Sequence, residues 1–408
     1  MSSTTPAEPS TPAGNASSRR RYDIDWLRIG AFGLLIFYHI GMFFNTEGWH
    51  AKSTSANTAM EPIMWLSSPW RLPLLFFISG IAIRYLSDKL GSGRFAVDRV
   101  WRLFPVIVFG MYVIVAPQTY SELVQAGEVS SGFFEFYLGY AGTWDGPYSI
   151  HTPTWNHLWY VVYLFVYCLL LTPLIPVLRW LVDHRWMSEM TAWARRSRMG
   201  PVLILLLPTI PLFVIRFTLS NRFDTTHDLF NDWANHAISF GFVFWGYLIA
   251  KQEALWALVD RARWLAVSVT LILFGFLLLS YQDWAVTASH EIWLWAARLA
   301  RVVYTWSIIL ALLGLARRYL NHDGPVRRYL SEAIFPFYIL HQTITVVTGF
   351  WIAPLGLNVW VEFVILVIAT LGGCVLGFEL VKRIAPLRPV MGLKWRREKT
   401  SFTKVDVM

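Results

Sequence analysis

The chain has few charged residues for its length. Of its 408 residues, 15% are charged and 55% are hydrophobic, and the mean hydropathy is +0.45. Soluble globular domains carry about a quarter charged residues, so this composition argues against a soluble protein. It also excludes a disordered chain, which would be polar and poor in aromatic residues. Aromatic residues make up 16% of the chain, which is typical of the aromatic belts at membrane interfaces.

Cysteine is scarce, and the usual metal and nucleotide patterns are missing. Cys168 and Cys374 are the two cysteines, and both lie in apolar segments far apart in the sequence. Without a CxxC spacing, we interpret them as buried, reduced thiols. There is no H-E-x-x-H pattern and no glycine-rich nucleotide loop, so we predict no metal and no permanently bound cofactor.

Apolar runs of membrane-spanning length recur along the chain. A bilayer core needs about 20 mostly apolar residues per helix. Such runs cover residues 27–44, 63–85, 100–116, 158–178, 202–219, 233–250, 264–281, 292–315, 334–352 and 359–381, of which the run at 233–250 is the least distinct. We therefore predict an all-α integral membrane protein, a bundle of about ten transmembrane helices.

The distribution of the basic residues indicates how the chain is oriented in the membrane and argues against nucleic-acid binding. Lys and Arg number 35 against 26 Asp and Glu, which gives a net charge of +9. They form short clusters between apolar runs instead of one surface stripe, so no nucleic-acid partner is expected. Alternate connections are rich in Lys and Arg, whereas the stretch 117–157 contains neither. By the positive-inside rule, both termini are predicted to be cytoplasmic.

This pattern predicts three parts of the chain. Residues 1–20 are rich in Ser, Thr, Pro and Ala and are expected to form a disordered cytoplasmic tail. Residues 21–385 are expected to form the transmembrane domain. Residues 386–408 are expected to form a basic cytoplasmic tail that contacts anionic lipid headgroups.

Five ionisable residues fall inside the predicted membrane helices, where a charge costs several kcal/mol and suggests a functional site. They are His39, Arg71, Arg298, Arg301 and His341. From the rise of 1.5 Å per residue, the first four are expected at one level in the outer half, at depths of roughly 8 to 14 Å, and His341 in the inner half. Three of them also have a purely structural explanation. His39 and His341 can hydrogen-bond between helices, and Arg71 can extend to the interface. Arg298 and Arg301 are harder to explain in this way, because two arginines on one helical face need counter-charges or a wet cavity. Together they favour a polar cavity in the bundle.

Arginine and histidine suit two kinds of activity. Arginine binds anionic groups, and a neutral histidine can take a proton from a hydroxyl. These groups suit acyl transfer to an alcohol. They equally suit a transporter or flippase for an anionic or glycan-related solute, and a structural or sensory role remains a third reading.

Four segments in order carry patterns of a known family. They are D-W-L-R at 25–28 followed by His39, R-L-P-L-L-F-F-I-S-G at 71–80, R-V-W-R-L-F-P at 99–105, and F-P-F-Y-I-L-H at 335–341. Together they resemble the signatures of the acyltransferase-3 family of integral membrane acyltransferases. A fourth-helix signature of many members, W-S-L-x-x-E, is replaced here by H-L-W-Y at 157–160. That form, with Trp49 and His50, resembles the branch that modifies periplasmic glucans, whose members transfer succinyl groups.

The resemblance implies an activity and its partners. It implies transfer of an acetyl or succinyl group from cytoplasmic acyl-CoA, a co-substrate, to a hydroxyl of an extracytoplasmic glycan or lipid-linked saccharide. The expected location is the bacterial inner membrane. His39 is expected to act as the general base or to carry the acyl group briefly. Arg71, Arg298 and Arg301 are expected to stabilise the oxyanion or an acyl carboxylate, and His341 is counted among the catalytic residues.

Two further sets of residues are expected to bind the substrates. Near the inner ends of their helices, the residues expected to bind acyl-CoA are Asp25, Arg28, Arg99 and Arg102. On the outer side, the residues expected to bind the acceptor are Trp49, His50, His151, Asn156, His157 and Trp159. For the inner set, the positive-inside signal is the alternative explanation.

Overall fold

The computed structural model describes residues 20–130, 132–142, 146 and 148–395, and within these ranges the chain is helical without strands. The helices that form the apolar segments are α1 (Tyr22–Met42), α2 (Glu61–Leu90), α3 (Ser92–Phe109), α4 (Ala116–Gln125), α6 (Trp159–Asp183), α8 (Gly200–Leu206), α9 (Thr209–Thr218), α10 (Trp233–Ile249), α11 (Glu253–Gln282), α13 (Glu291–Tyr319), α14 (Pro325–Ile352) and α15 (Val359–Arg383). Short helices are α5 (Phe133–Gly142), α7 (Arg185–Arg196), α12 (Trp284–Ser289) and α16 (Leu387–Val390). The prediction of an all-α membrane bundle is confirmed.

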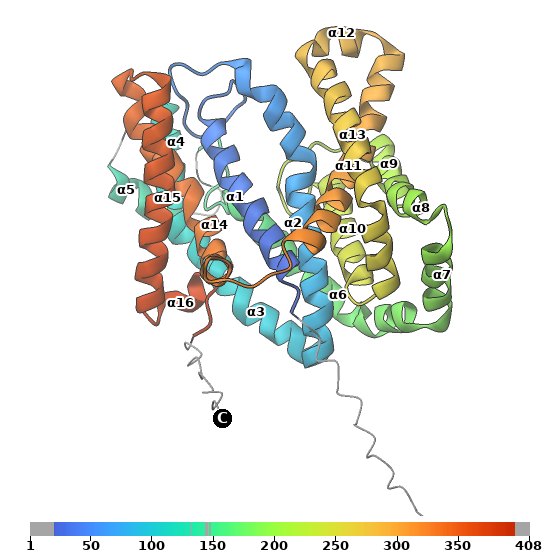
Figure 1. The fold of residues 1–408 in the computed structure, drawn as a ribbon. Coiled ribbons are helices and arrows are strands. Elements are labelled where there is room, and N and C mark those ends of the chain that lie inside the picture. The colour runs from blue at the N-terminus through green and yellow to red at the C-terminus, as the bar shows by residue number, and fades with distance from the viewer. Residues whose placement is uncertain (1–19, 131, 143–145, 147, 396–408) are drawn as a thin grey trace, which may run out of the picture.

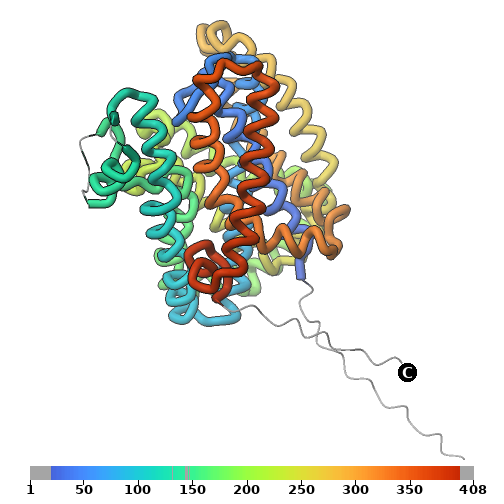
Figure 2. The backbone as a smooth tube through the Cα atoms, turned by 90° about the vertical axis from the view of Figure 1, so that its left-hand side faces the viewer, coloured from blue at the N-terminus to red at the C-terminus, as the bar shows by residue number. Residues whose placement is uncertain are grey.

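In the described part of the chain, nine helical segments are long and apolar enough to cross a membrane. Some are composite, since α3 continues into α4 through a π-helical turn at Gly110–Ile114, and α8 continues into α9. α10, with 17 residues, occupies the place of the remaining apolar run. The start of α1 and the short helix α16 lie at the same end of the bundle, opposite α12 (Figures 1 and 2). An even number of crossings would produce this arrangement, so it supports counting α10 as a tenth crossing.

α10 packs against α2 with the two backbones in direct contact at glycines. A β-carbon at Gly80 would overlap the carbonyl of Val243, and one at Gly246 would overlap the carbonyl of Phe77. Small residues allow membrane helices to approach until their backbones touch, which maximises van der Waals contact where no hydrophobic effect acts between helices. The close contact with α10 therefore explains why position 80 is a glycine. This explanation is independent of the family signature at 71–80, to which Gly80 also belongs.

Ion pairs join the helices at the end where α1 begins. Asp88 of α2 contacts Arg84 at 2.8 Å, Arg179 of α6 at 2.7 Å and Lys251 at 2.5 Å. In the loop before α14, hydrogen bonds from Arg328 and Arg327 hold the pKa of Asp323 well below its usual range. Many basic residues at this end are thus paired with carboxylates and hold neighbouring helices together.

The predicted tails lie largely outside the described residues. Of the tail 1–20 only Arg20 is described, and of the tail 386–408 only residues 386–395 are described. Within the latter, α16 packs against α3 and α15. Arg388 is buried and donates hydrogen bonds to the carbonyls of Lys382 and Lys394. The boundaries of both tails and the lipid contacts of the C-terminal tail stay predictions.

The glycine contact predicts a large difference between two substitutions in α10. Gly246→Ala is expected to destabilise the protein by about 1–3 kcal/mol, because the methyl group forces α2 and α10 apart. Gly241→Ala, in the same helix with open space around it, is the matched control and is expected to leave stability unchanged or raise it. Thermal unfolding of the purified protein in detergent measures both variants. Equal unfolding temperatures would contradict the contact.

Candidate functional site

Two histidines from distant parts of the chain form a hydrogen-bonded pair inside the bundle. His39 of α1 and His341 of α14 approach with 2.8 Å between Nδ1 of His39 and Nε2 of His341. Their rings are parallel within 2°, with centroids 5.0 Å apart. His341 is fully buried, and its Nδ1 lies 2.6 Å from the carbonyl oxygen of Tyr338.

The expected depth of His341 is corrected by this pair. α14 begins at Pro325, well before the apolar run that starts at residue 334, so His341 lies 16 residues into the helix. His39 lies 17 residues into α1. The 2.8 Å contact places both histidines at one level.

The hydrogen bonds determine which nitrogen of His39 is free. A carbonyl oxygen only accepts, so Nδ1 of neutral His341 carries the proton and its Nε2 is a lone pair. That lone pair accepts from Nδ1–H of His39, so Nε2 of neutral His39 is also a lone pair. No described residue forms a hydrogen bond with this Nε2. The pair therefore presents a basic nitrogen in a fixed tautomer, as a general base requires.

Arg71 lies beside this pair, and only some of its hydrogen-bond donors have partners. Its side chain is 6% exposed, and its guanidinium carbon lies 3.6 Å from the ring centroid of Tyr38, the neighbour of His39. The Nε and Nη1 atoms of Arg71 are buried without a hydrogen-bond partner. Buried donors without partners are costly, so these two atoms are suited to bind an anionic oxygen. The sequence analysis did not single out Tyr38.

The loop after α1 folds over the histidine pair. The ring of Trp49 lies 6.3 Å from that of His39, and Nδ1 of His50 lies 2.6 Å from a carboxylate oxygen of Glu122 on α4. Lys52 holds the loop closed by donating to the carbonyls of Met42 and Asn45, at 2.7 and 2.8 Å. Burial lowers the pKa of Lys52. Trp49 and His50, both predicted to bind the acceptor, are thus near the base.

His157 and Asn156 belong to a buried amide network behind the pair. Nε2 of His157 donates to the carbonyl of Ile339 at 3.0 Å, and its Nδ1 accepts from the side chain of Gln118 at 3.3 Å. Gln342 donates to Gln118 and to Asn156, at 3.1 and 2.7 Å. Both ring nitrogens of His157 are therefore occupied by the protein. The sequence analysis missed Gln118 and Gln342, although Gln342 directly follows His341 in the apolar run.

Trp159 faces another polar cluster. Its ring stacks on His227, with centroids 4.3 Å apart. Asp232, completely buried, accepts hydrogen bonds from the hydroxyl of Tyr163 at 2.7 Å and from the backbone of His227 at 3.1 Å. Burial lowers the pKa of His227, against the opposing effect of Asp232. His151 is exposed.

Arg298 and Arg301 do not join this site. They line a separate pocket of about 220 Å³ with Arg216, Tyr281 and other side chains, and neither His39 nor Arg71 lines it. The expectation of one cavity shared by all the arginines is therefore wrong. Depth along a helix follows from the sequence, but the direction in which a side chain points across the bundle depends on packing. Arg216 was missed because it lies near the end of its apolar run.

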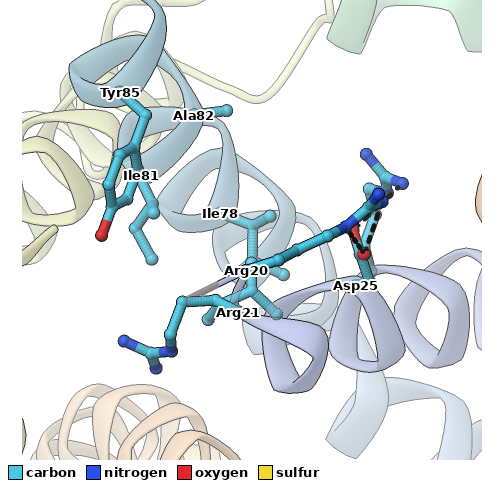
Figure 3. A pocket seen from close by; sticks show the side chains of 9 residues that line it. Arg20, Arg21, Asp25, Ile78, Ile81, Ala82 and Tyr85 are labelled. Carbon is cyan, nitrogen blue, oxygen red and sulfur yellow. Dashed lines mark hydrogen bonds and ion pairs between the residues drawn. The ribbon is translucent and has the colours of Figure 1, made fainter. Parts of the chain in front are cut away.

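A pocket of about 250 Å³ opens where α1 begins, and Asp25 and Arg28 line it (Figure 3). Asp25 contacts Arg327 at 2.6 Å and Arg20 at 3.0 Å, while Nε of Arg28 is buried without a partner. Arg20 reaches toward Asp25, Arg21 points away, and the side chains of α2 form the opposite wall (Figure 3). Arg99 and Arg102 of α3 do not line this pocket, and both pair with Asp98.

Three buried aromatic rings pack together at the level of Phe32, which lies between Arg28 and His39 on α1. Phe32 follows Arg28 by one helical turn on α1. Its ring centroid lies 5.1 Å from that of Tyr338 and 6.0 Å from that of Tyr160, and all three side chains are buried. The hydroxyl of Tyr160 is within 2.7 Å of the Ser79 hydroxyl. This aromatic layer thus lies between the levels of the pocket residue Arg28 and of His39 along α1.

Comparison with known proteins finds relatives that match nearly the whole chain. Glucans biosynthesis protein C from Escherichia coli O139:H28 (strain E24377A / ETEC) is 21% identical over 392 residues, covering 91% of this chain and 94% of that protein. The proteins of the same name from Escherichia coli O81 (strain ED1a) and Shigella dysenteriae serotype 1 (strain Sd197) have the same identity and coverage. No solved structure shows a significant match.

The family assignment rests on nearly the whole bundle. Residues 21–379 match the family described as "Acyltransferase domain", the acyltransferase-3 family. The match begins at the start of α1 and ends in α15, so it includes both histidines of the pair and Arg71. This chain therefore belongs to the acyltransferase-3 family and is a multi-pass membrane acyltransferase that transfers groups other than aminoacyl groups.

Proposed function

We propose that the protein transfers an acyl group, acetyl or succinyl, from cytoplasmic acyl-CoA to a hydroxyl of an extracytoplasmic glycan or glycolipid. The observation that carries this proposal is the free Nε2 of His39, held by His341 beside the unpartnered donors of Arg71. The name of the relatives, glucans biosynthesis protein C, supports a glycan acceptor. The location proposed is the bacterial inner membrane with both termini cytoplasmic, from the distribution of Lys and Arg.

In the proposed reaction His39 acts as the base. Its Nε2 takes the proton from the acceptor hydroxyl while that oxygen attacks the thioester carbonyl carbon. The carbonyl oxygen becomes an oxyanion, which Arg71 stabilises with Nε–H and Nη1–H. The carbon–sulfur bond then breaks, and the CoA thiolate takes the proton back from Nε2. The products are an ester and free CoA, and His39 returns to its starting tautomer.

His341 supports this cycle through its hydrogen bond. While His39 holds the extra proton, Nδ1–H of the imidazolium still donates to Nε2 of His341. A hydrogen bond from a charged donor is stronger than one from a neutral donor, so the bond gains strength in the intermediate. His341 is thus a positioning residue for His39.

The inner pocket is the proposed entry for the donor. Arg28 and Arg20 offer cations for phosphate groups, and 11 residues separate Arg28 from His39, roughly 17 Å along α1. An extended pantetheine arm can cover much of that distance once the layer of Phe32, Tyr160 and Tyr338 opens. The alternative chemical route, a transient acyl group on His39, would let donor and acceptor use the site in turn. If the acyl group is succinyl, Arg71 can also bind its distal carboxylate.

The test of the base is a histidine exchange with a matched control. His39→Gln is expected to lower the rate of acyl transfer by about 10²–10⁴, the usual contribution of a general base. His290→Gln, at an exposed histidine before α13, is expected to leave the rate unchanged. Thiol release from acetyl-CoA or succinyl-CoA, dependent on an added oligosaccharide glucan, is measured in membranes. A transporter would release no thiol, and full activity in His39→Gln would remove His39 from the chemistry.

Two substitutions at His341 distinguish the effect of losing its hydrogen bond to His39 from the effect of losing side-chain volume. His341→Ala is expected to lower kcat by about 10- to 100-fold, since a hydrogen bond to a charged group contributes about 1.5–3 kcal/mol. His341→Gln introduces an amide oxygen that can accept from Nδ1–H of His39, and should restore most of kcat. KM for both substrates is expected to stay within about twofold in steady-state assays. An equal loss in both variants would contradict the hydrogen-bond role.

The donor pocket predicts a KM effect. Arg28→Gln is expected to raise KM for acyl-CoA about tenfold with a smaller change in kcat, because a cation that binds the donor equally in ground and transition states is lost. Arg94→Gln removes an exposed charge at the same end of the bundle and serves as the control. Steady-state kinetics with varied acyl-CoA decide this. An unchanged KM in Arg28→Gln would exclude Arg28 from donor binding.

A further inference from the structure

The pocket of Arg216, Arg298 and Arg301 has no function in the mechanism above. Arg216 comes from α9 and the other two from α13, and the pocket is completed by Trp65, Tyr281 and Trp284. None of the three arginines forms an ion pair with a described carboxylate. Arg301 donates a hydrogen bond to the hydroxyl of Tyr281 at 2.8 Å, and the Arg298 guanidinium lies 5.3 Å from the ring of Trp295.

Three like charges in one half-buried pocket repel one another. Arg216 is close enough to both other arginines for their charges to act on it. Cations inside a membrane protein are ordinarily balanced by carboxylates, carbonyls or a water-filled cavity. Here the described side chains around the pocket supply hydroxyl and indole groups and no ion-paired carboxylate. The pocket therefore carries a surplus of positive charge that an anionic ligand would balance.

The surroundings of the pocket indicate an amphiphilic ligand. Large apolar side chains on the same two helices face outward from the protein: Ile210 and Val214 of α9 are 56% and 52% exposed, and Leu299 of α13 is 47% exposed. Phe217 and Trp295 stack with centroids 4.8 Å apart and join α9 to α13 beside Arg298. In a bilayer these exposed side chains contact acyl chains. Arg298 lies seven residues into α13, roughly 10 Å from its start, within reach of a headgroup region.

We propose that these three arginines bind the phosphate of an anionic phospholipid, whose acyl chains lie along the exposed apolar side chains of α9 and α13. Guanidinium groups bind phosphate oxygens through paired, charge-assisted hydrogen bonds. The hydrogen bond to Tyr281 and the stacking on Trp295 hold two of the guanidinium groups in place before the lipid arrives. Inorganic phosphate offers the same oxygens without the acyl chains, so the test compares both sources.

The experiment measures lipid binding to the full-length protein and does not depend on acyl transfer. The protein is delipidated in detergent, and bound phosphatidylglycerol or phosphatidylcholine is quantified by native mass spectrometry. The wild type is expected to bind phosphatidylglycerol at least tenfold more tightly than phosphatidylcholine. The variant with Arg216→Gln, Arg298→Gln and Arg301→Gln should lose at least tenfold in phosphatidylglycerol affinity, with phosphatidylcholine binding unchanged.

The matched control removes the same number of charges from exposed arginines around the end of α7. The variant with Arg195→Gln, Arg196→Gln and Arg198→Gln is expected to stay within twofold of the wild type. Wild-type affinity in the pocket variant would overturn the proposal. Inorganic phosphate that displaces phosphatidylglycerol at equal concentration would overturn the lipid assignment and identify a soluble phosphate as the ligand.

A folding defect would not leave the proposal undecided. Gel filtration and thermal unfolding report whether the triple variant is folded. If it is not, Arg216→Gln and Arg298→Gln are tested singly, each expected to weaken phosphatidylglycerol binding several-fold. Unchanged affinity in both single variants would also overturn the proposal. Because the readout is lipid binding, its failure is distinct from a failure of the proposed enzymatic function.

Discussion

Polar groups in a bilayer must find partners inside the protein, and the hydrogen bond between His39 and His341 is the interaction on which the site depends. It joins α1 and α14 and brings their histidines to one level. The carbonyl of Tyr338 sets the tautomer of His341, and His341 sets that of His39. A backbone oxygen in one helix thereby determines which nitrogen of another helix is basic.

Some of the surrounding polar residues have all their hydrogen-bonding groups paired within the protein, and others keep donors without partners. Gln118, Gln342 and His157 satisfy one another or backbone carbonyls, and they make the wall behind the histidine pair rigid. Arg71 and Arg28 retain buried nitrogens without partners. Fully satisfied networks favour a single conformation, whereas buried donors without partners favour a ligand that supplies oxygen atoms. The open donors of these two arginines lie at the two places where substrate chemistry is proposed, on either side of the aromatic layer.

The arginines illustrate how one residue type can take different roles in one membrane domain. Arg84 and Arg327 are paired with carboxylates near the end where α1 begins and hold helices together. Arg71 is buried under Tyr38 beside the base. Arg216, Arg298 and Arg301 gather without ion pairs near lipid-facing side chains. Charge alone does not distinguish these groups, and their partners do.

The sequence by itself determined the class of the protein. Apolar runs of bilayer length established the all-α membrane bundle, because hydrocarbon tolerates only helices whose backbone groups are internally bonded. The family-like signatures also singled out His39 and His341 as candidates, but not the contact between them. These conclusions depend on composition and on order along the chain, which need no knowledge of packing.

Only the tertiary structure decided which side chains share a space. The depth of His341 was misjudged because α14 extends below its apolar run, and Arg298 and Arg301 were assigned to the wrong cavity. Position along a helix is a one-dimensional quantity, whereas the direction a side chain takes depends on how neighbouring helices are rotated against each other. Glycine contacts such as Gly80 against Val243 set that packing, and they arise between segments more than 150 residues apart.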